Sequence, residues 1–483
     1  MQFVVVQKIL GILLTLFSTT MLPPLAVSWW FKDGVSHSFV LSFLSILLLG
    51  LALWFPVRHV RRELRLRDGF VVVVMFWAGL GVIGSLPLLI THHPYMSMSD
   101  AVFESVSGLT TTGATVVTGI DYLPVSIQYY RQQLRWLGGM GIIVLAVAIL
   151  PMLGIGGMQL YRAETPGPVK DTKLTPRIAE TAKALWNIYL ALTVCCALLY
   201  WFAGMSAFDA VAHSFSTISI GGFSTHDLSI GYFNSRLIDA IAVVFMILAG
   251  MNFTLHFITW QSFNVRHYLM DAEARMYLLA LGVICIISCS YLILAGIYPD
   301  YGSAVTHGVF QTVSIATTTG FTTATYQSWP TFLPVLLLFA SFMGACAGST
   351  GGGLKVMRVL LLFKQGWREL QRLIHPNAVF AIKLGERPVE ERVMSAVWGF
   401  FASYVLVFAV IMLLLMATGL DQVTAFSAMA ACLNNLGPGL GSVSTHYGDI
   451  NEIAKWLLCL AMLLGRLEIF TLLVILTPAF WTR

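Results

Sequence analysis

The sequence predicts an all-α polytopic membrane protein built from four tandem copies of one unit: a helix, a short helix and a second helix. Two additional N-terminal transmembrane helices precede the copies. Three observations support this fold class. The 483 residues are 57% apolar and only 11% charged, whereas roughly a quarter of the residues in a soluble protein are charged. The apolar segments are long enough to cross a membrane, and a glycine-containing motif recurs four times.

The long apolar segments are predicted to be helices, because barrel strands would alternate polar and apolar residues. Ten segments have the roughly 20 apolar residues that a membrane span needs. They lie near residues 9–30, 38–55, 70–91, 129–153, 182–204, 236–262, 275–297, 331–362, 393–418 and 453–480. Shorter apolar stretches lie near residues 99–111, 208–219, 306–318 and 424–435. These four are too short to cross the membrane and are typical of re-entrant helices.

The distribution of basic residues predicts the orientation of the spans. Lysine and arginine gather in four loops that alternate to one side of the membrane, and the positive-inside rule makes that side cytoplasmic. These loops lie at residues 58–67, 162–177, 266–275 and 364–392. The loops that contain the short helices carry aspartates instead and are predicted to face outside. Both termini are then expected to be cytoplasmic.

Aligning the chain on one glycine shows four internal copies of the unit. The copies read SDAVFESVSGLTTTGAT, FDAVAHSFSTISIGGFS, THGVFQTVSIATTTGFT and VTAFSAMAACLNNLGPG. The shared glycines are Gly113, Gly222, Gly320 and Gly437. The predicted divisions are 1–68 for the two extra helices, then 69–158, 177–263, 274–363 and 393–483 for the repeats, with a basic cytoplasmic loop at 364–392.

Such a unit exposes polar backbone at membrane depth, which is tolerated only when it is buried in protein or lines a water-filled path. Four copies in a pseudo-fourfold arrangement would supply that path. Each short helix would act as a pore helix whose carbonyl end favours a cation, and the loop after it could replace the hydration shell of the ion. Glycine and threonine also serve as small packing residues in membrane helices. Four copies in register favour a cation filter.

The motifs TTTGAT, SIGGFSTH, TTTGFTT, NNLGPGLG and GACAGSTGGGLKVMR resemble the Trk/Ktr/HKT superfamily of potassium transporters, and specifically its bacterial TrkH/TrkG branch. The resemblance covers essentially the whole chain. It implies that backbone oxygens coordinate potassium at Thr111, Thr112, Gly113, Ile220, Gly221, Gly222, Thr318, Thr319, Gly320, Asn435, Leu436 and Gly437. Plant relatives that prefer sodium carry serine at the first shared glycine, so four glycines imply potassium. The fourth loop departs most, which predicts an asymmetric filter.

Residues 344–353, GACAGSTGGG, interrupt the eighth predicted span. Each glycine costs ~1 kcal/mol relative to alanine in a helix, so a continuous helix is disfavoured. The segment is no phosphate loop, because the lysine that follows lacks the required neighbours. It is either a packing hinge or, as the resemblance also implies, a gating loop below the filter. The predicted gate residues are Gly344, Gly348, Ser349, Thr350, Gly351, Gly352, Gly353 and Arg466.

Arg466 lies inside the last predicted span, where an arginine costs at least ~2.5 kcal/mol and usually faces water or a partner. It either forms a positive constriction under the filter or pairs with an acid such as Glu104; both roles are compatible. Arg131 and Arg135 open the fourth span on the outer side. They are expected to stabilise the outer ends of the short helices or to pair with Asp121.

Three function classes follow from these patterns. A gated potassium pathway fits repeats that share one direction, whereas a proton- or sodium-coupled symporter is usually built from inverted repeats. Coupling would also require a titrating intramembrane acid, for which Glu104 and Glu468 are the candidates. An intramembrane enzyme is disfavoured, because His213, His256 and His307 form no pair at ligand spacing.

The sequence contains no nucleotide motif, and no intrinsic cofactor is expected; potassium is the substrate. The resemblance implies a homodimer in the bacterial inner membrane, assembled on a cytosolic ring of TrkA-type subunits that bind nucleotides. The basic loop 364–392 is either a membrane-surface anchor or the docking site for such a partner.

Overall fold

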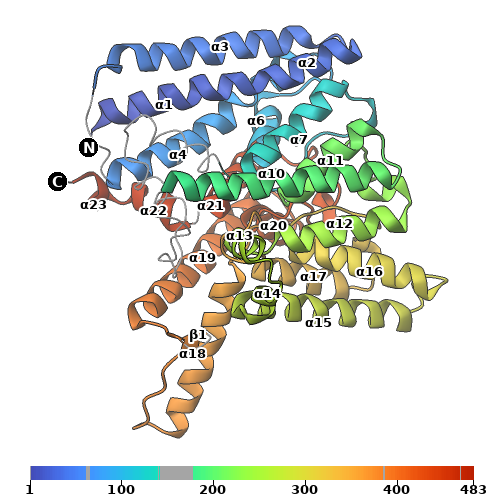
Figure 1. The fold of residues 1–483 in the computed structure, drawn as a ribbon, viewed down its shortest axis with the longest axis vertical. Helices are drawn as coiled ribbons and strands as arrows, with labels where there is room; N and C mark the ends of the chain where they lie inside the picture. The colour runs from blue at the N-terminus through green and yellow to red at the C-terminus, as the bar shows by residue number, and fades with distance from the viewer. Residues whose placement is uncertain are drawn as a thin grey trace.

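The computed structural model describes residues 2–60, 66–139, 141, 178–384, 387–467 and 469–482. The described part is helical apart from one antiparallel pair of short strands, β1 (Lys383–Leu384) and β2 (Arg387–Pro388). Most of the long helices lie side by side in one bundle, and the two ends of the chain lie close together at the same end of that bundle (Figure 1). This arrangement is consistent with both termini lying on one side of a membrane.

Three helices precede the repeats and pack along one edge of the bundle (Figure 1). They are α1 (Phe3–Ser18), α2 (Leu22–Phe31) and α3 (Ser36–Trp54). Helices α1 and α2 are joined by a 3-10 turn and together form the first predicted span. Helix α1 approaches α3 closely because glycines face each other: a Cβ on Gly11 would lie 2.9 Å from the carbonyl oxygen of Gly50. Small residues are a common means of packing membrane helices.

The four repeats follow in chain order. Repeat 1 contains α4 (Leu66–Ile83), α5 (Leu86–Ile90), α6 (Met98–Leu109) and α7 (Val125–Gly139). Repeat 2 contains α10 (Ile178–Phe202), α11 (Ala207–Ile218), α12 (Arg236–Ala249) and α13 (Phe253–Ser262). Repeat 3 contains α14 (Arg266–Met270), α15 (Ala272–Leu294), α16 (Tyr301–Ala316), α17 (Phe332–Met343) and α18 (Val356–Ile374). Repeat 4 contains α19 (Glu391–Ala417), α20 (Gln422–Leu433), α21 (Glu452–Arg466), α22 (Ile469–Leu476) and α23 (Pro478–Trp481).

The four predicted short helices are present as α6, α11, α16 and α20. Each begins at a side-chain cap, where a serine or aspartate oxygen accepts a hydrogen bond from an amide three residues later. The capping residues are Ser97, Ser206, Asp300 and Asp421. Such a cap satisfies one of the amide groups that a helix leaves unpaired at its first turn. The start of each short helix is therefore encoded locally.

Two predicted spans bend sharply at points where the sequence indicates no break. The span predicted at 236–262 bends by 97° between α12 and α13, where Asn252 caps the new helix through the amide of Thr254. The break leaves the carbonyl of Gly250 free, and it accepts a hydrogen bond from the amide of Cys346 in the glycine-rich segment 344–353. The last span is likewise divided into α21 and α22. Sequence hydropathy does not detect either break.

The eighth predicted span is broken at its glycines, as expected, into α17 and α18. The fourth predicted span, 129–153, is described only to residue 141. Within the described residues, six helices are long and apolar enough to cross a membrane, and two bent pairs raise this number to eight.

The repeats close into a ring around the short helices. Helix α21 of repeat 4 packs against α6 of repeat 1, and one buried apolar cluster joins the N-terminal helices to both of these repeats. Helix α18 projects from the bundle and runs past the short strands (Figure 1). The loops that follow the short helices are thereby gathered at the centre.

Candidate functional site

Each short helix ends in a loop with the same backbone conformation. The residue two positions before the shared glycine has a left-handed φ between 54° and 68°, and the shared glycine itself has a φ between 73° and 99°. The four residues of the first kind are Thr111, Ile220, Thr318 and Asn435. Left-handed backbone is costly for residues with a side chain, so its recurrence in four loops indicates a conformation required by the site.

The amide groups of these loops turn back into the short helices. In every repeat, the amide one position before the shared glycine donates to the carbonyl five residues earlier, over 2.7–2.9 Å. The donors are Thr112, Gly221, Thr319 and Leu436. In a trans peptide the carbonyl points opposite to the amide that follows it. The carbonyls of Thr111, Ile220, Thr318 and Asn435 therefore point away from the ends of their short helices.

The four loops meet as neighbours around one axis. A Cβ placed on Gly113 would lie 2.8 Å from the carbonyl oxygen of Gly221, and one on Gly437 would lie 2.7 Å from that of Thr112. A Cβ on Gly222 or Gly320 would overlap the carbonyl oxygen of the loop that follows it in the ring. All twelve predicted filter residues are thus brought together, and each shared glycine leaves space for the backbone of a neighbouring repeat.

Polar side chains on the short helices support the loops from behind. Glu104, nine residues before its glycine, accepts hydrogen bonds from Thr115 Oγ1 and from the amide of Val116, each at 3.0 Å. At the same position in repeat 2, His213 Nε2 lies 2.9 Å from Ser224 Oγ. In repeat 3, Gln311 donates to the carbonyl of Ala324 over 2.8 Å. Repeat 4 has Ala428 there, and its neighbour Ser427 donates to the carbonyl of Leu440.

The fourth loop is held differently, as the sequence predicts. Asn435 Nδ2 donates to Thr112 Oγ1 of repeat 1 over 2.9 Å and to the carbonyl of Met462 over 3.1 Å. The preceding Asn434 accepts from the Tyr404 hydroxyl over 2.5 Å. Asn434 stands at the position where Thr110 and Thr317 each pair with a second threonine in repeats 1 and 3.

The inner glycine-rich loop, residues 344–355, lies directly below this ring. The amide of Gly352 donates to Thr318 Oγ1 over 2.8 Å, and the amide of Gly353 donates to the carbonyl of Asn434 over 3.1 Å. A Cβ on Gly351 would lie 3.0 Å from the carbonyl oxygen of Thr317. Six of the seven predicted gate residues in this loop are buried or half-buried against neighbouring repeats. In this position the loop would obstruct passage from the ring.

Arg466, at the end of α21 in repeat 4, contacts both the inner loop and the end of α7. Its guanidinium donates to the carbonyls of Thr350, over 3.1 Å, and Gly139, over 2.9 Å, and also to that of Gly138. Lys355, which follows the glycines of the loop, donates to the carbonyl of Gly351. Glu468 lies outside the described residues.

The suggested pairing of Arg466 with Glu104 is wrong, because Glu104 instead pairs with Arg131 at 2.8 Å and both side chains are about 1% exposed. The two residues can pair because Glu104 lies on α6 and Arg131 lies on the adjacent helix α7. Arg135, one turn further along α7, is fully buried and lies over the ring of Phe223, with Cζ 3.2 Å from the ring centroid. Among the described residues, none of its three guanidinium nitrogens has a hydrogen-bond partner.

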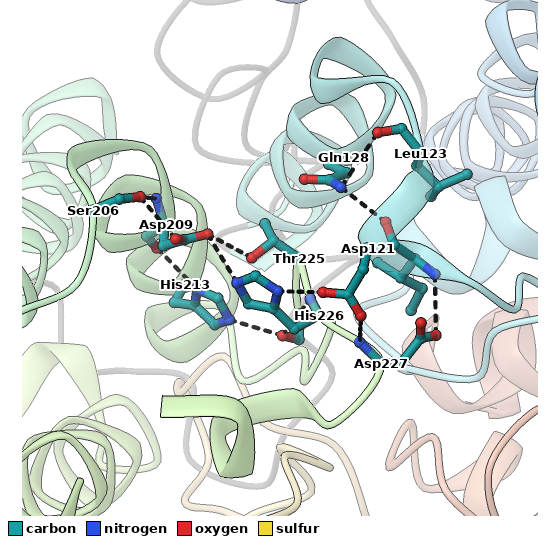
Figure 2. Close-up of polar contacts among 11 residues, drawn as sticks. Asp121, Leu123, Gln128, Ser206, Asp209, His213, Thr225, His226 and Asp227 are labelled. Atoms are coloured by element: carbon teal, nitrogen blue, oxygen red, sulfur yellow. Dashed lines mark hydrogen bonds and ion pairs between the residues drawn. The ribbon is translucent and has the colours of Figure 1, made fainter. Parts of the chain in front are cut away.

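The expected pairing of Asp121 with these arginines is also wrong, because Asp121 binds His226 of repeat 2. His226 Nδ1 lies 2.5 Å from Asp121, and Nε2 lies 3.5 Å from Asp209 (Figure 2). The imidazole also stacks on Tyr232 at 3.5 Å between ring centroids. Burial alone would lower the pKa of His226, but hydrogen bonds and charge from Asp209 and Asp121 outweigh it and raise the pKa. The network joins the outer loops of repeats 1 and 2.

Aspartates at the outer ends of the short helices remain charged. Hydrogen bonds from Ser303 lower the pKa of Asp300, and those from Thr424 lower the pKa of Asp421. An acidic outer surface attracts cations toward the ring. Together with the loop carbonyls that are left free of the short helices, which can replace water around a cation, the arrangement suits cation binding from the outer side.

Sequence reasoning missed several of these residues. Phe223 lies one residue after the second shared glycine, and His226 lies four residues after it. Only the folded ring shows that both contact repeat 1. The matched positions of Glu104, His213 and Gln311 could have been found, since all three lie nine residues before a shared glycine.

Comparison with known proteins agrees with this architecture. The chain matches the TrkH family model, described as a cation transport protein, over residues 35–482. Proteins named Trk system potassium uptake protein TrkH are 59% identical over 484 residues in Vibrio parahaemolyticus and 54% identical over 481 residues in Escherichia coli K12, with 100% of both chains covered. The crystal structure of the potassium transporter TrkH from Vibrio parahaemolyticus matches with a TM-score of 0.91 and 55% identity, covering 100% of each chain. The resemblance in the motifs is confirmed: the chain belongs to the TrkH family, which comprises cation transporters and not enzymes.

Proposed function

We propose that this protein takes up potassium across the bacterial inner membrane through a gated, channel-like pore whose selectivity filter is the ring of four glycine loops. One observation carries the proposal: four neighbouring loops share the same left-handed backbone, with amides turned into the short helices and the preceding carbonyls turned away from them. A ring of backbone carbonyls is the known chemistry of potassium filters. The potassium specificity rests on the names of the relatives.

The inner loop and Arg466 form the proposed gate. The loop contacts the inner ends of the filter loops in repeats 3 and 4, and Arg466 contacts the loop from repeat 4. An ion leaving the filter would meet both. A change in the loop would therefore open the pathway without altering the filter, which separates gating from selectivity.

Regulation by a cytosolic nucleotide-binding ring and assembly as a homodimer are part of the same proposal. The projecting helix α18 and the basic loop 364–392 supply a surface suited to such a partner. Arg368 on α18 is held by Glu391 of α19 through two hydrogen bonds of 2.9 and 3.0 Å. These hydrogen bonds connect α18 to repeat 4, so a partner bound to α18 could act on both repeat 3 and repeat 4.

A pore is favoured over a coupled symporter by the surroundings of Glu104. This acid is bound by Arg131, by a threonine hydroxyl and by a backbone amide. It therefore serves as a fixed support of the filter loop. A proton carrier must instead gain and lose its proton during each cycle.

Rubidium and sodium uptake by the purified protein in liposomes, with an imposed voltage and no other gradient, tests the proposal. Rubidium entry driven by voltage alone, with sodium excluded, is the expected result. If uptake begins only when a proton or sodium gradient is added, the protein is a symporter. Uptake that appears only after a cytosolic nucleotide-binding subunit is added supports a pore that the inner loop keeps shut.

A further inference from the structure

Glu273 is a buried acid beside the inner loop that has no role in the filter. It lies in the first turn of α15 and is 3% exposed. Its Oε1 atom accepts a hydrogen bond from the amide of Ala347 over 2.7 Å and another from the amide of Met357 over 3.1 Å. A buried carboxylate is costly unless it is hydrogen-bonded or paired. The two amides therefore account for its position.

These two amides lie at opposite ends of the inner loop. Ala347 is near the start of the loop, and Met357 is in the first turn of α18, which follows the loop. One carboxylate from a different helix thus holds both ends. The middle of the loop is held by other bonds, such as that from Gly352 to Thr318. Hydrogen bonds to a charged acceptor are the stronger kind.

The position of Met357 connects this contact to the rest of the protein. Helix α18 begins with residues whose amides contact Glu273 and the inner loop, and it projects out of the bundle (Figure 1). A displacement of α18 along its axis would change the distance between Glu273 and the amide of Met357. The carboxylate is consequently a contact through which movement of the projecting helix reaches the loop.

We propose that Glu273 is a positioning residue that holds the inner loop closed below the filter, and that release of its two hydrogen bonds is a step in opening. The inference rests on the proposed function, since it assigns a latch to the same gate. Glu273 contacts no filter residue, and its effect on transport acts through the loop.

The test compares Glu273→Ala and Glu273→Gln with the unmodified protein in liposomes without any partner. Rubidium uptake under an imposed voltage should rise about tenfold or more in Glu273→Ala, because losing one such bond shifts an equilibrium by about this factor. Glu273→Gln keeps an oxygen acceptor without the charge and should give an intermediate rise. The ratio of rubidium to sodium uptake should not change. Glu452→Gln is the matched control, since Glu452 is an exposed acid in the first turn of α21.

A second measurement reports loop movement directly. The Cys346 thiol lies in the inner loop and is 1% exposed. A water-soluble methanethiosulfonate should modify it faster in Glu273→Ala, and peptide mass mapping reads this site separately from the other cysteines. A residue that merely stabilises α15 would lower the melting temperature without increasing both uptake and Cys346 modification.

Unchanged uptake and unchanged Cys346 modification in a folded Glu273→Ala protein would overturn the inference. If Glu273→Ala does not fold, unchanged uptake and unchanged Cys346 modification in Glu273→Gln would overturn the inference instead. Glutamine matches glutamate in size, so this variant should fold. A variant with residues 344–353 shortened separates the two proposals. If it conducts rubidium while the Glu273 variants stay closed, only the latch is wrong; if it also fails to conduct at normal folding, the proposed gated pore is wrong.

Discussion

Replacing Gly113 with serine should reduce discrimination between potassium and sodium. Gly113 has a φ of 97°, and a left-handed backbone costs ~1–2 kcal/mol for a residue with a side chain. The new Cβ would also lie 2.8 Å from the carbonyl oxygen of Gly221 and 3.3 Å from that of Leu436. These two oxygens must move by a few tenths of an ångström. Because both oxygens belong to other loops of the proposed filter, the displacement acts directly on the proposed ion sites.

The strain predicts the size of the effect. A change of 1–2 kcal/mol corresponds to a factor of about 5–30, so the permeability ratio of potassium to sodium should fall by about tenfold. The ratio is obtained from reversal potentials of the reconstituted protein under bi-ionic conditions. Gly119→Ser is the matched control: Gly119 also has a left-handed φ, of 69°, but its Cβ would meet only a tyrosine ring carbon at 3.8 Å. An unchanged ratio in Gly113→Ser at wild-type stability would refute the reasoning.

Three further predictions concern charged side chains. Arg466→Ala should raise basal rubidium uptake several-fold, since it releases the inner loop; a decrease at normal folding would assign Arg466 a structural role. Arg131→Met should lower the free energy of unfolding by ~3–5 kcal/mol, because it leaves the charge of Glu104 buried and uncompensated. Arg135→Met should be neutral or stabilising. Equal melting temperatures for the two variants would contradict this. The stabilisation from His226 should be complete below about pH 6.5 and be lost as the pH rises through the raised pKa of His226. The melting temperature of the unmodified protein should fall over this pH range, and that of His226→Gln should not show this fall.

Much of the fold could be predicted because each feature has a local signal. The four short helices are encoded by a capping serine or aspartate that precedes a stretch too short to cross the membrane, and the shared glycine marks each loop. The break in repeat 3 is encoded by five glycines in residues 344–353. In all these cases the residues that determine the structure are close together in the sequence.

The break between α12 and α13 could not be predicted, because a single glycine at position 250 is compatible with a continuous membrane helix. What stabilises the break is distant in the sequence. The amide of Cys346 in the inner loop donates to the carbonyl of Gly250, and the amide of Phe253 donates to the carbonyl of Gly348 in the same loop. Glu273 was missed for the same reason: as an acid at the start of a span it is typical of an ordinary first turn. Only the folded loop shows that it has a second role.

The supports behind the four filter loops explain how one backbone conformation can give an asymmetric filter. The position nine residues before the shared glycine holds an acid, a histidine, an amide and an alanine in repeats 1 to 4. The acid has a buried arginine partner, the histidine bonds one hydroxyl and the amide bonds one carbonyl. Stronger, charged bonds fix a loop more firmly than neutral ones. Since the four backbones share left-handed φ values at the same two positions, differences among the ion sites should arise from these supports, and the loop of repeat 1 should be the most rigid.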